Sequence, residues 1–226
     1  MWGIIPIKSL NQAKHRLKHV LYPEERQEFF KAMFEDVLST MMSVPDFEKV
    51  AVATVCPAAG IIAKKYGATV LSTSQDEGQT AAVERSAEIL EAKGISSMLM
   101  IPGDVPLVTV EEIKIVLELH KKAPSMTIVP AHDELGSNCI ALSPPTAVPL
   151  CFGPNSYFPH LETARKLGLG LQTPKLPGLG LDIDTPEDLL KLSRQTLSTR
   201  AQEYLLKKNI LERLNNKSKK NLIYKI

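Results

Sequence analysis

Short apolar runs alternate with longer amphipathic segments along most of this 226-residue chain, and this alternation limits its fold more than any other feature. Apolar runs typical of buried strands lie at 2–7, 50–54, 69–71, 97–101 and 125–130. Segments with apolar residues at helical spacing lie between them, at 23–42, 58–66, 80–93 and 110–122. Strand–helix–strand repeats build mostly parallel sheets with helices on both faces. The sequence therefore predicts a three-layer α/β/α fold.

The pattern becomes less regular after residue 130. Residues 131–180 are rich in Pro and Gly and predict only one strand, at 138–142, and one short helix, at 160–167. We interpret this region as an elaboration over one edge of the sheet. Lids and substrate pockets are often found on such loops.

Regular structure is expected to return near the C-terminus. A strand is predicted at 181–184, and Thr185 is a typical N-cap for the helix that follows it. A last amphipathic helix is predicted at 201–214, before a tail rich in Lys and Asn. We expect one catalytic or binding domain over 1–195, and a C-terminal helix with a basic tail over 196–226.

Composition and charge exclude several classes of protein. The net charge of +2, from 27 basic and 25 acidic residues, is too small for a nucleic-acid footprint. Cys56, Cys139 and Cys151 contain no CxxC unit, so neither a disulfide framework nor a cysteine zinc site is indicated. The N-terminal apolar run is much shorter than that of a signal peptide, and no run approaches the ~20 apolar residues of a membrane span. We expect a cytoplasmic protein with no membrane or nucleic-acid partner.

Acidic residues follow two of the predicted strands. Segment 102–106 (PGDVP) places Asp104 at the carboxyl end of its strand, where α/β sheets bind ligands. Asp182 and Asp184 alternate with apolar residues, so their carboxylates point the same way in an extended chain. Adjacent carboxylates favour a cation such as Mg²⁺. The alternatives are that 102–106 is only a turn, that Asp184 only adds charge to a helix N-terminus, and that Asp182 is solvated.

The loop after the first strand supplies positive charge through Lys8, Lys14 and Arg16. Doubly wound sheets usually bind phosphate in this loop, but the chain lacks a Gly-rich fingerprint. Lys and Arg side chains would therefore be the main ligands of a polyphosphate. The alternative is an exposed basic helix face. His15 and His19 have the spacing of half a zinc site, but no third ligand accompanies them.

Two loops in the irregular region combine small residues with hydroxyl and amide groups, at 136–138 (GSN) and 152–156 (FGPNS). Small residues allow backbone N–H groups to approach an anion, and a Ser hydroxyl can hydrogen-bond to a carboxylate. Such segments can also be ordinary loops. His160, close to a predicted helix start, could contact a phosphate or cap the helix at the surface.

Together these motifs resemble those of the 2-phospho-L-lactate guanylyltransferase (CofC) family. The segments that carry the resemblance are 5–10 (IPIKSL), 13–17 (AKHRL), 103–107 (GDVPL), 136–138 (GSN), 152–160 and 181–188 (LDIDTPED). They occur in the family's order from residue 4 to about residue 192. Each motif alone is weak, and the combination is specific.

The resemblance implies a nucleotidyltransferase fold of the glycosyltransferase-A type and a role in making the deazaflavin coenzyme F420. The implied reaction joins GTP and 2-phospho-L-lactate to give lactyl-2-diphospho-5′-guanosine and pyrophosphate, with Mg²⁺ as cofactor. A homodimer is a candidate assembly. The alternatives are a nucleotidyltransferase of the same fold that acts on phosphoenolpyruvate, a sugar-1-phosphate or the molybdenum cofactor, and a non-catalytic nucleotide-binding module.

The resemblance also implies roles for individual residues. Mg²⁺ would be held by Asp104, Asp182 and Asp184. The triphosphate would be held by Lys8, Lys14 and Arg16, which form the catalytic set together with Asp104. The carboxylate and phosphate of the acceptor would contact Ser137, Gly153 and Ser156. Gly78 and Thr80 would contact the nucleotide, although the chain has Gly-Gln-Thr-Ala-Ala at 78–82 where the family usually has Gly-Leu-Asn-x-Ala.

Overall fold

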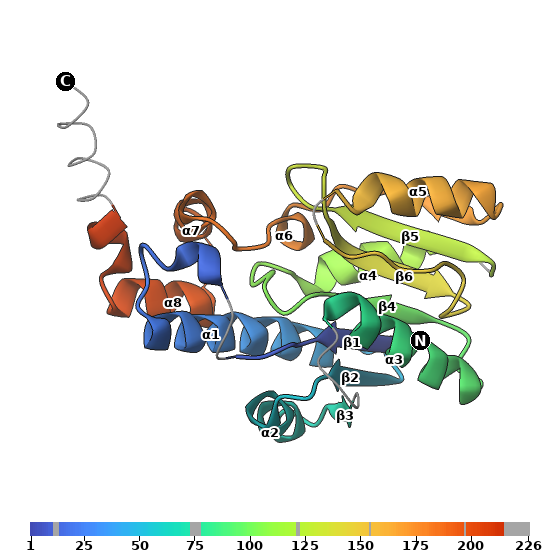
Figure 1. Cartoon of the computed structure of the whole chain (residues 1–226), viewed down its shortest axis with the longest axis horizontal. Helices are drawn as coiled ribbons and strands as arrows, with labels where there is room; N and C mark the ends of the chain where they lie inside the picture. The colour runs from blue at the N-terminus through green and yellow to red at the C-terminus, as the bar shows by residue number, and fades with distance from the viewer. Residues whose placement is uncertain (11–13, 73–77, 121–122, 154, 197, 215–226) are drawn as a thin grey trace.

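The computed structural model describes residues 1–10, 14–72, 78–120, 123–153, 155–196 and 198–214. Within these ranges, seven strands form one sheet (Figure 1). They are β1 (Trp2–Pro6), β2 (Lys49–Ala53), β3 (Thr69–Leu71), β4 (Met98–Met100), β5 (Ser125–Pro130), β6 (Ser137–Ser143) and β7 (Gly170–Gln172). Their order is β3-β2-β1-β4-β6-β5-β7, and β6 runs antiparallel to β4 and β5 while the other pairs are parallel. The predicted mostly parallel sheet is confirmed.

Helices cover both faces of this sheet. They are α1 (Pro23–Met42), α2 (Pro57–Lys65), α3 (Gln79–Ala92), α4 (Val110–Leu119), α5 (Tyr157–Lys166), α6 (Pro177–Gly180), α7 (Pro186–Ser193) and α8 (Arg200–Lys207), with a short 3-10 helix at His15–Leu17. Alternate strand residues enter two separate cores. Ile5 and Val52 pack with the α1 side, whereas Ile4 and Ala53 pack with the side of α3 and α5. The three-layer prediction is therefore confirmed.

Hydroxyl caps fix where two of the helices begin. Thr109 Oγ1 accepts the Glu112 N–H at 3.1 Å and starts α4. Thr185 starts α7 through a reciprocal capping box with Asp188, whose carboxylate accepts the Thr185 N–H at 2.9 Å. Such caps satisfy N–H groups that have no partner inside the helix. The predicted role of Thr185 is confirmed.

The predicted strand at 181–184 is wrong. Helix α6 precedes this segment, and the chain then runs extended without joining the sheet. A backbone hydrogen bond from Ile183 N to Asp104 O, at 3.0 Å, ties it to the loop after β4. Leu181 and Ile183 are nevertheless buried, so the predicted alternation with outward-facing carboxylates holds without a β-ladder.

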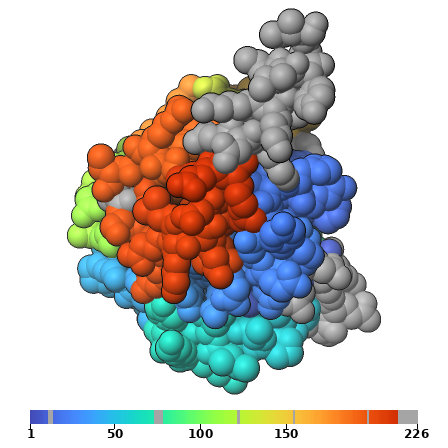
Figure 2. All heavy atoms as spheres, turned by 90° about the vertical axis from the view of Figure 1, so that its left-hand side faces the viewer, coloured from blue at the N-terminus to red at the C-terminus, as the bar shows by residue number. Residues whose placement is uncertain are grey.

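The C-terminal segment packs against α1, as Figures 1 and 2 show. Asp36 of α1 is buried and accepts the Arg200 and Ala201 N–H groups, each at 3.0 Å, which fixes the start of α8. The predicted helix at 201–214 is interrupted near Asn209, whose φ of 50° is left-handed. The division of the chain at residue 195 stays a prediction, and the basic tail lies outside the described residues. No helix in the described ranges has both the length and the apolar character to cross a membrane.

Candidate active site

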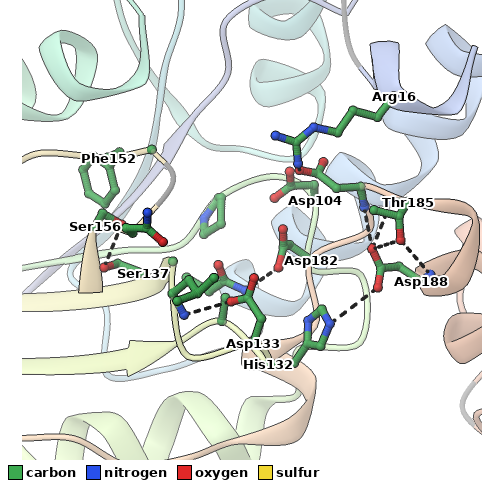
Figure 3. Close-up of a pocket in the computed structure, with 18 of the residues that line it drawn as sticks. Arg16, Asp104, His132, Asp133, Ser137, Phe152, Ser156, Asp182, Thr185 and Asp188 are labelled. Carbon is green, nitrogen blue, oxygen red and sulfur yellow. Dashed lines mark hydrogen bonds and ion pairs between the residues drawn. The ribbon is translucent and has the colours of Figure 1, made fainter. Parts of the chain in front are cut away.

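A cavity of about 540 Å³ lies at the sheet edge where the parallel strands end (Figure 3). Because β6 is antiparallel, its first residues reach the same edge as the loop after β4. The lining includes Arg16, Asp104, Ser137, Asn138, Gly153, Ser156, Asp182 and Asp184. Ligands of open α/β sheets bind at this position. Seven of the residues selected from the sequence are therefore neighbours in one cavity.

Figure 3 shows the hydroxyl groups of Ser137 and Ser156 on one side of this cavity, with Asp104 and Arg16 on the other. A second cavity, of about 130 Å³, lies beside the first and shares Asp104 with it. Lys8 and Gly78 line this smaller space. Asp104 thus stands between two adjoining spaces, which suits a residue that acts on two substrates.

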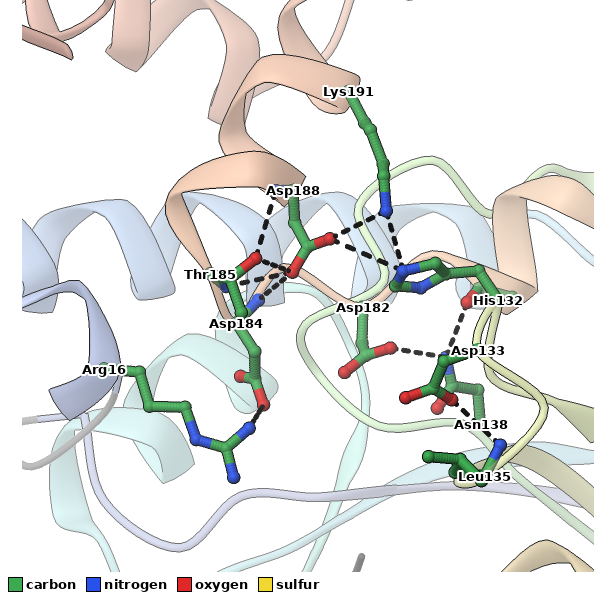
Figure 4. Close-up of polar contacts among 11 residues, drawn as sticks. Arg16, His132, Asp133, Leu135, Asn138, Asp182, Asp184, Thr185, Asp188 and Lys191 are labelled. Carbon is green, nitrogen blue, oxygen red and sulfur yellow. Dashed lines mark hydrogen bonds and ion pairs between the residues drawn. The ribbon is translucent and has the colours of Figure 1, made fainter. Parts of the chain in front are cut away.

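Lys14 is buried beneath the acidic side chains. Its Nζ lies 2.6 Å from Asp104 Oδ2 and 2.6 Å from Asp184 Oδ1, and its side chain is 4% exposed. Burial alone would lower the pKa of Lys14, but the charges of the two carboxylates raise it above its usual value. Arg16 Nη1 adds a longer contact of 3.5 Å to Asp184 (Figure 4). Lys14 therefore holds the loops of Asp104 and Asp184 together, and its role in binding triphosphate stays a prediction.

Asp182 is held by a side-chain amide, a role that the GSN motif at 136–138 did not indicate. Asn138 Nδ2 donates to Asp182 Oδ1 at 3.1 Å and to Gly180 O at 3.1 Å (Figure 4). Burial raises the pKa of Asp182, and the nearby negative charge of Asp104 raises it further. The two carboxylates are therefore close enough to repel each other.

Among the described residues, Asp104 Oδ1 is buried and has no hydrogen-bond partner. A buried carboxylate oxygen without a donor is costly, and a second carboxylate beside it increases that cost. A divalent cation removes both penalties, and Mg²⁺ in nucleotide sites uses only one or two carboxylates together with phosphate oxygens and water. No ready-made group of three His, Cys, Asp or Glu ligands exists within the described ranges. Asp104 and Asp182 therefore fit Mg²⁺ as a pair, while Asp184 faces Lys14 and Arg16.

Ser137, Gly153 and Ser156, predicted to contact the acceptor, come together on the opposite wall. Ser156 Oγ donates to Ser137 Oγ at 3.1 Å, and Ser156 N donates to Gly153 O at 3.3 Å. Gly153 has a φ of 141°, in the region that favours glycine. Thr80 lines neither cavity and instead accepts the Phe152 N–H at 3.0 Å, which holds the same loop.

His160 is fully buried inside α5, so the prediction of a surface cap is wrong. Its Nδ1 lies 3.0 Å from Ser137 Oγ, and its Nε2 accepts the Cys151 N–H at 3.0 Å. Burial lowers the pKa of His160 to about 4, so the ring is neutral at physiological pH. No sequence pattern around His160 predicts that its ring lies behind the cavity wall that carries Ser137.

His132, Asp188 and Lys191 form a further polar group at the cavity rim (Figure 4). Lys191 Nζ lies 2.7 Å from His132 Nε2 and 3.2 Å from Asp188 Oδ1. Burial opposes ionisation of Asp188, yet hydrogen bonds from Thr185 and Lys191 outweigh it and lower its pKa. Sequence reasoning missed this group, because Lys191 and His132 are 59 positions apart.

The profile of the family described as "Guanylyl transferase CofC like" matches residues 1–225. A phosphoenolpyruvate guanylyltransferase of Roseiflexus castenholzii is 34% identical over 212 residues, which cover 92% of this chain and 97% of that protein. A 3-phospho-D-glycerate guanylyltransferase of Colwellia psychrerythraea is 34% identical, covering 82% and 88%. A 2-phospho-L-lactate guanylyltransferase of Methanothermobacter thermautotrophicus is 30% identical, covering 91% and 89%.

Among solved structures, a candidate nucleotide-diphospho-sugar transferase of Desulfovibrio desulfuricans superposes with a TM-score of 0.75. It covers 95% of this chain and 96% of its own, at 16% sequence identity. At that identity the likeness concerns the fold, and it agrees with the nucleotidyltransferase fold expected from the sequence.

Proposed function

The chain belongs to the family of CofC-like guanylyl transferases, and from that premise we propose that it joins GTP to a small phosphorylated acid and releases pyrophosphate. The enzyme class, nucleotidyltransferase, follows from family and fold. The observation that carries the proposal is Asp104 Oδ1, which has no partner among the described residues and lies beside Asp182 where two cavities adjoin. This arrangement suits a cation shared by two anionic substrates.

Within this proposal, Asp104 and Asp182 would hold Mg²⁺. Asp184, the third carboxylate of the predicted set, would stay paired with Lys14 and Arg16. Bound Mg²⁺ would neutralise charge on the phosphates as it develops in the reaction. Arg16, at the rim of the larger cavity, and Lys8, beside the smaller one, would reduce the repulsion between the two polyanions. Lys14 would join them in binding triphosphate only if it left its carboxylate partners.

The proposed nucleophile is a phosphate oxygen of the acid, which is already ionised near neutral pH because its second pKa is about 6. It forms a bond to the α-phosphorus of GTP, and the bond from that phosphorus to the β-phosphate bridge breaks to release pyrophosphate. No proton needs to be removed from the nucleophile, so a general base is unnecessary. The protein contributes in-line placement and charge neutralisation. Ser137, Ser156 and the Gly153 backbone would place the acid.

We propose 2-phospho-L-lactate as the acid, which gives lactyl-2-diphospho-5′-guanosine in coenzyme F420 synthesis. Phosphoenolpyruvate is the second candidate, since a 34% identical relative bears that name. The two acids differ at one carbon and present the same carboxylate and phosphate to the hydroxyl wall. The cytoplasmic location and the homodimer remain predictions beside this proposal.

The test is pyrophosphate release from GTP, ATP, CTP and UTP, each with 2-phospho-L-lactate, phosphoenolpyruvate, 3-phospho-D-glycerate and sugar-1-phosphates. We expect release with GTP and one phospho acid. Release with a sugar-1-phosphate alone would assign the chain to another nucleotidyltransferase reaction. GTP binding without release for any acceptor would indicate a nucleotide-binding module.

A further inference from the structure

The hydroxyl group of Ser137 has a hydrogen-bond environment that fixes its direction. It lies on the cavity wall at the start of β6 and is contacted by Ser156 and by His160. A hydroxyl oxygen has two acceptor positions and one hydrogen to donate. Which of these positions is free determines what kind of substrate group the wall can bind.

The backbone sets the protonation of His160. Because an amide N–H can only donate, the contact from Cys151 N at 3.0 Å requires His160 Nε2 to be the unprotonated nitrogen. The ring is neutral, so its single proton must lie on Nδ1. Nδ1–H then donates to Ser137 Oγ at 3.0 Å. A main-chain group behind the wall thus selects the tautomer that faces the serine.

Ser137 Oγ consequently accepts two hydrogen bonds, one from His160 Nδ1–H and one from the Ser156 hydroxyl at 3.1 Å. Both acceptor positions are filled, and within the described part of the chain only the hydrogen of Ser137 remains for the cavity. The oxygen is also polarised by two donors, which strengthens the bond that its own hydrogen can donate. A group with lone pairs, and above all an anionic oxygen, is the partner for this hydroxyl.

We propose that His160 is a positioning residue, which locks the Ser137 hydroxyl as a donor aimed into the cavity and thereby selects for an anionic oxygen of the phospho acid. The identity of that acid rests on the proposed function. The relay from Cys151 N through His160 to Ser137 depends only on the contacts described above. It should govern binding of the acid and leave GTP binding unchanged, because His160 lies behind the wall that carries Ser137 and Ser156.

Two substitutions at one position separate this role from simple packing. The amide of Asn places its nitrogen where His160 Nδ1 lies, so His160→Asn keeps the donor to Ser137. The longer Gln places its oxygen near Nε2, so His160→Gln keeps the acceptor for Cys151 N and loses the donor. Both variants remove the ring. His120→Gln is a matched control, since His120 also contacts serine, with Nε2 2.7 Å from Ser143 Oγ, at the other end of β6.

The experiment measures binding of phosphoenolpyruvate, 2-phospho-L-lactate and GTP to each protein by calorimetry, which requires no turnover. We expect His160→Gln to weaken binding of the acid about tenfold, the effect of one hydrogen bond to a charged group. His160→Asn should stay within about threefold of wild type, and His120→Gln should match wild type. GTP affinity should be the same in all four proteins.

Equal weakening by the Asn and Gln variants would overturn the relay and leave only a packing role for the ring. Wild-type protein that binds neither acid would overturn it as well. If the variants do not fold, ¹⁵N chemical shifts of the His160 ring in the wild type decide the matter, since a proton on Nε2 contradicts the proposal. Pyrophosphate release is scored separately, so an inactive protein that shows the expected binding pattern refutes the proposed function and not the relay.

Discussion

Replacement of Lys14 by Met tests the ion cluster that supports the cavity. The substitution removes the cation that contacts Asp104 and Asp184 at 2.6 Å each, and keeps most of the apolar volume of the side chain. Breaking a fully buried ion pair typically costs about 3–5 kcal/mol, because the remaining charge is left without a partner. Asp104 and Asp184 are 23% and 37% exposed, so water compensates part of this loss. We expect the free energy of unfolding to fall by about 2–4 kcal/mol.

The assay is urea unfolding in magnesium-free buffer, followed by circular dichroism. For a chain of this size the expected loss corresponds to roughly 4–16 °C in Tm. Lys175→Met is the matched control, because Lys175 also pairs with a carboxylate, that of Glu134, but is 70% exposed. Exposed ion pairs contribute little to stability, so this variant should resemble wild type.

Added Mg²⁺ should restore more stability to the Lys14→Met protein than to the wild type. Without the ammonium group, the carboxylates of Asp104, Asp182 and Asp184 repel one another and have more to gain from a cation. If Lys14→Met unfolds at the same urea concentration as Lys175→Met, the reasoning about the cluster is refuted. An equal gain in unfolding free energy on adding Mg²⁺ to the variant and to the wild type would contradict a cation site beside these carboxylates.

Three further predictions concern single side chains. Asp104→Asn should lower kcat/KM at least about a hundredfold in steady-state assays while the protein stays folded under assay conditions. Near-native turnover would remove Asp104 from the metal site. Asp36→Asn should lower the unfolding free energy by about 1–3 kcal/mol, because Asp36 accepts the first N–H groups of α8. The variant should keep the wild-type KM for both substrates, and a raised KM would show that α8 acts on the site. The pKa of His160 is lowered from 6.5 to about 4 in the folded state, so protonation of its ring favours the unfolded state. As the pH falls from 7 to 5, the free energy of unfolding of the wild type should therefore fall by about 2 kcal/mol. His160→Gln should not show this component of the pH dependence in urea titrations, and identical slopes for the two proteins would contradict the buried neutral ring.

The sequence was sufficient to predict the main layers and the edge that carries the site. Apolar periodicity located β1, β2, β4 and β5, and the rule that α/β sheets bind ligands at the carboxyl ends of their strands placed Asp104 at the edge that carries the site. The alternation of Asp182 and Asp184 with buried neighbours also held, although no strand forms there. These features depend on local pattern alone.

Features that depend on long-range hydrogen bonds were not predictable. Helix α6 has the sequence Pro-Gly-Leu-Gly, a weak helix former, and its first N–H groups depend on the buried carboxylate of Glu112. That carboxylate accepts the Gly178 N–H at 2.7 Å and the Leu179 N–H at 2.9 Å, from 66 and 67 positions away. The burial of Lys14 likewise needs carboxylates from two distant loops. The residues around Glu112 and around Lys14 show no pattern that predicts these distant hydrogen-bond partners.

We expect Asp104 and Asp182 to hold the cation that binds the nucleotide. A crystal of the protein grown with GTP and Mn²⁺, with data collected at the manganese absorption edge, tests it most directly. We expect an anomalous peak within ligand distance of Asp104 Oδ1 and of the Asp182 carboxylate, about 2.1 Å for a hard divalent ion of this size. A nucleotide bound in the cavity with Mn²⁺ elsewhere, and Asp104 Oδ1 still without a ligand, would contradict the account.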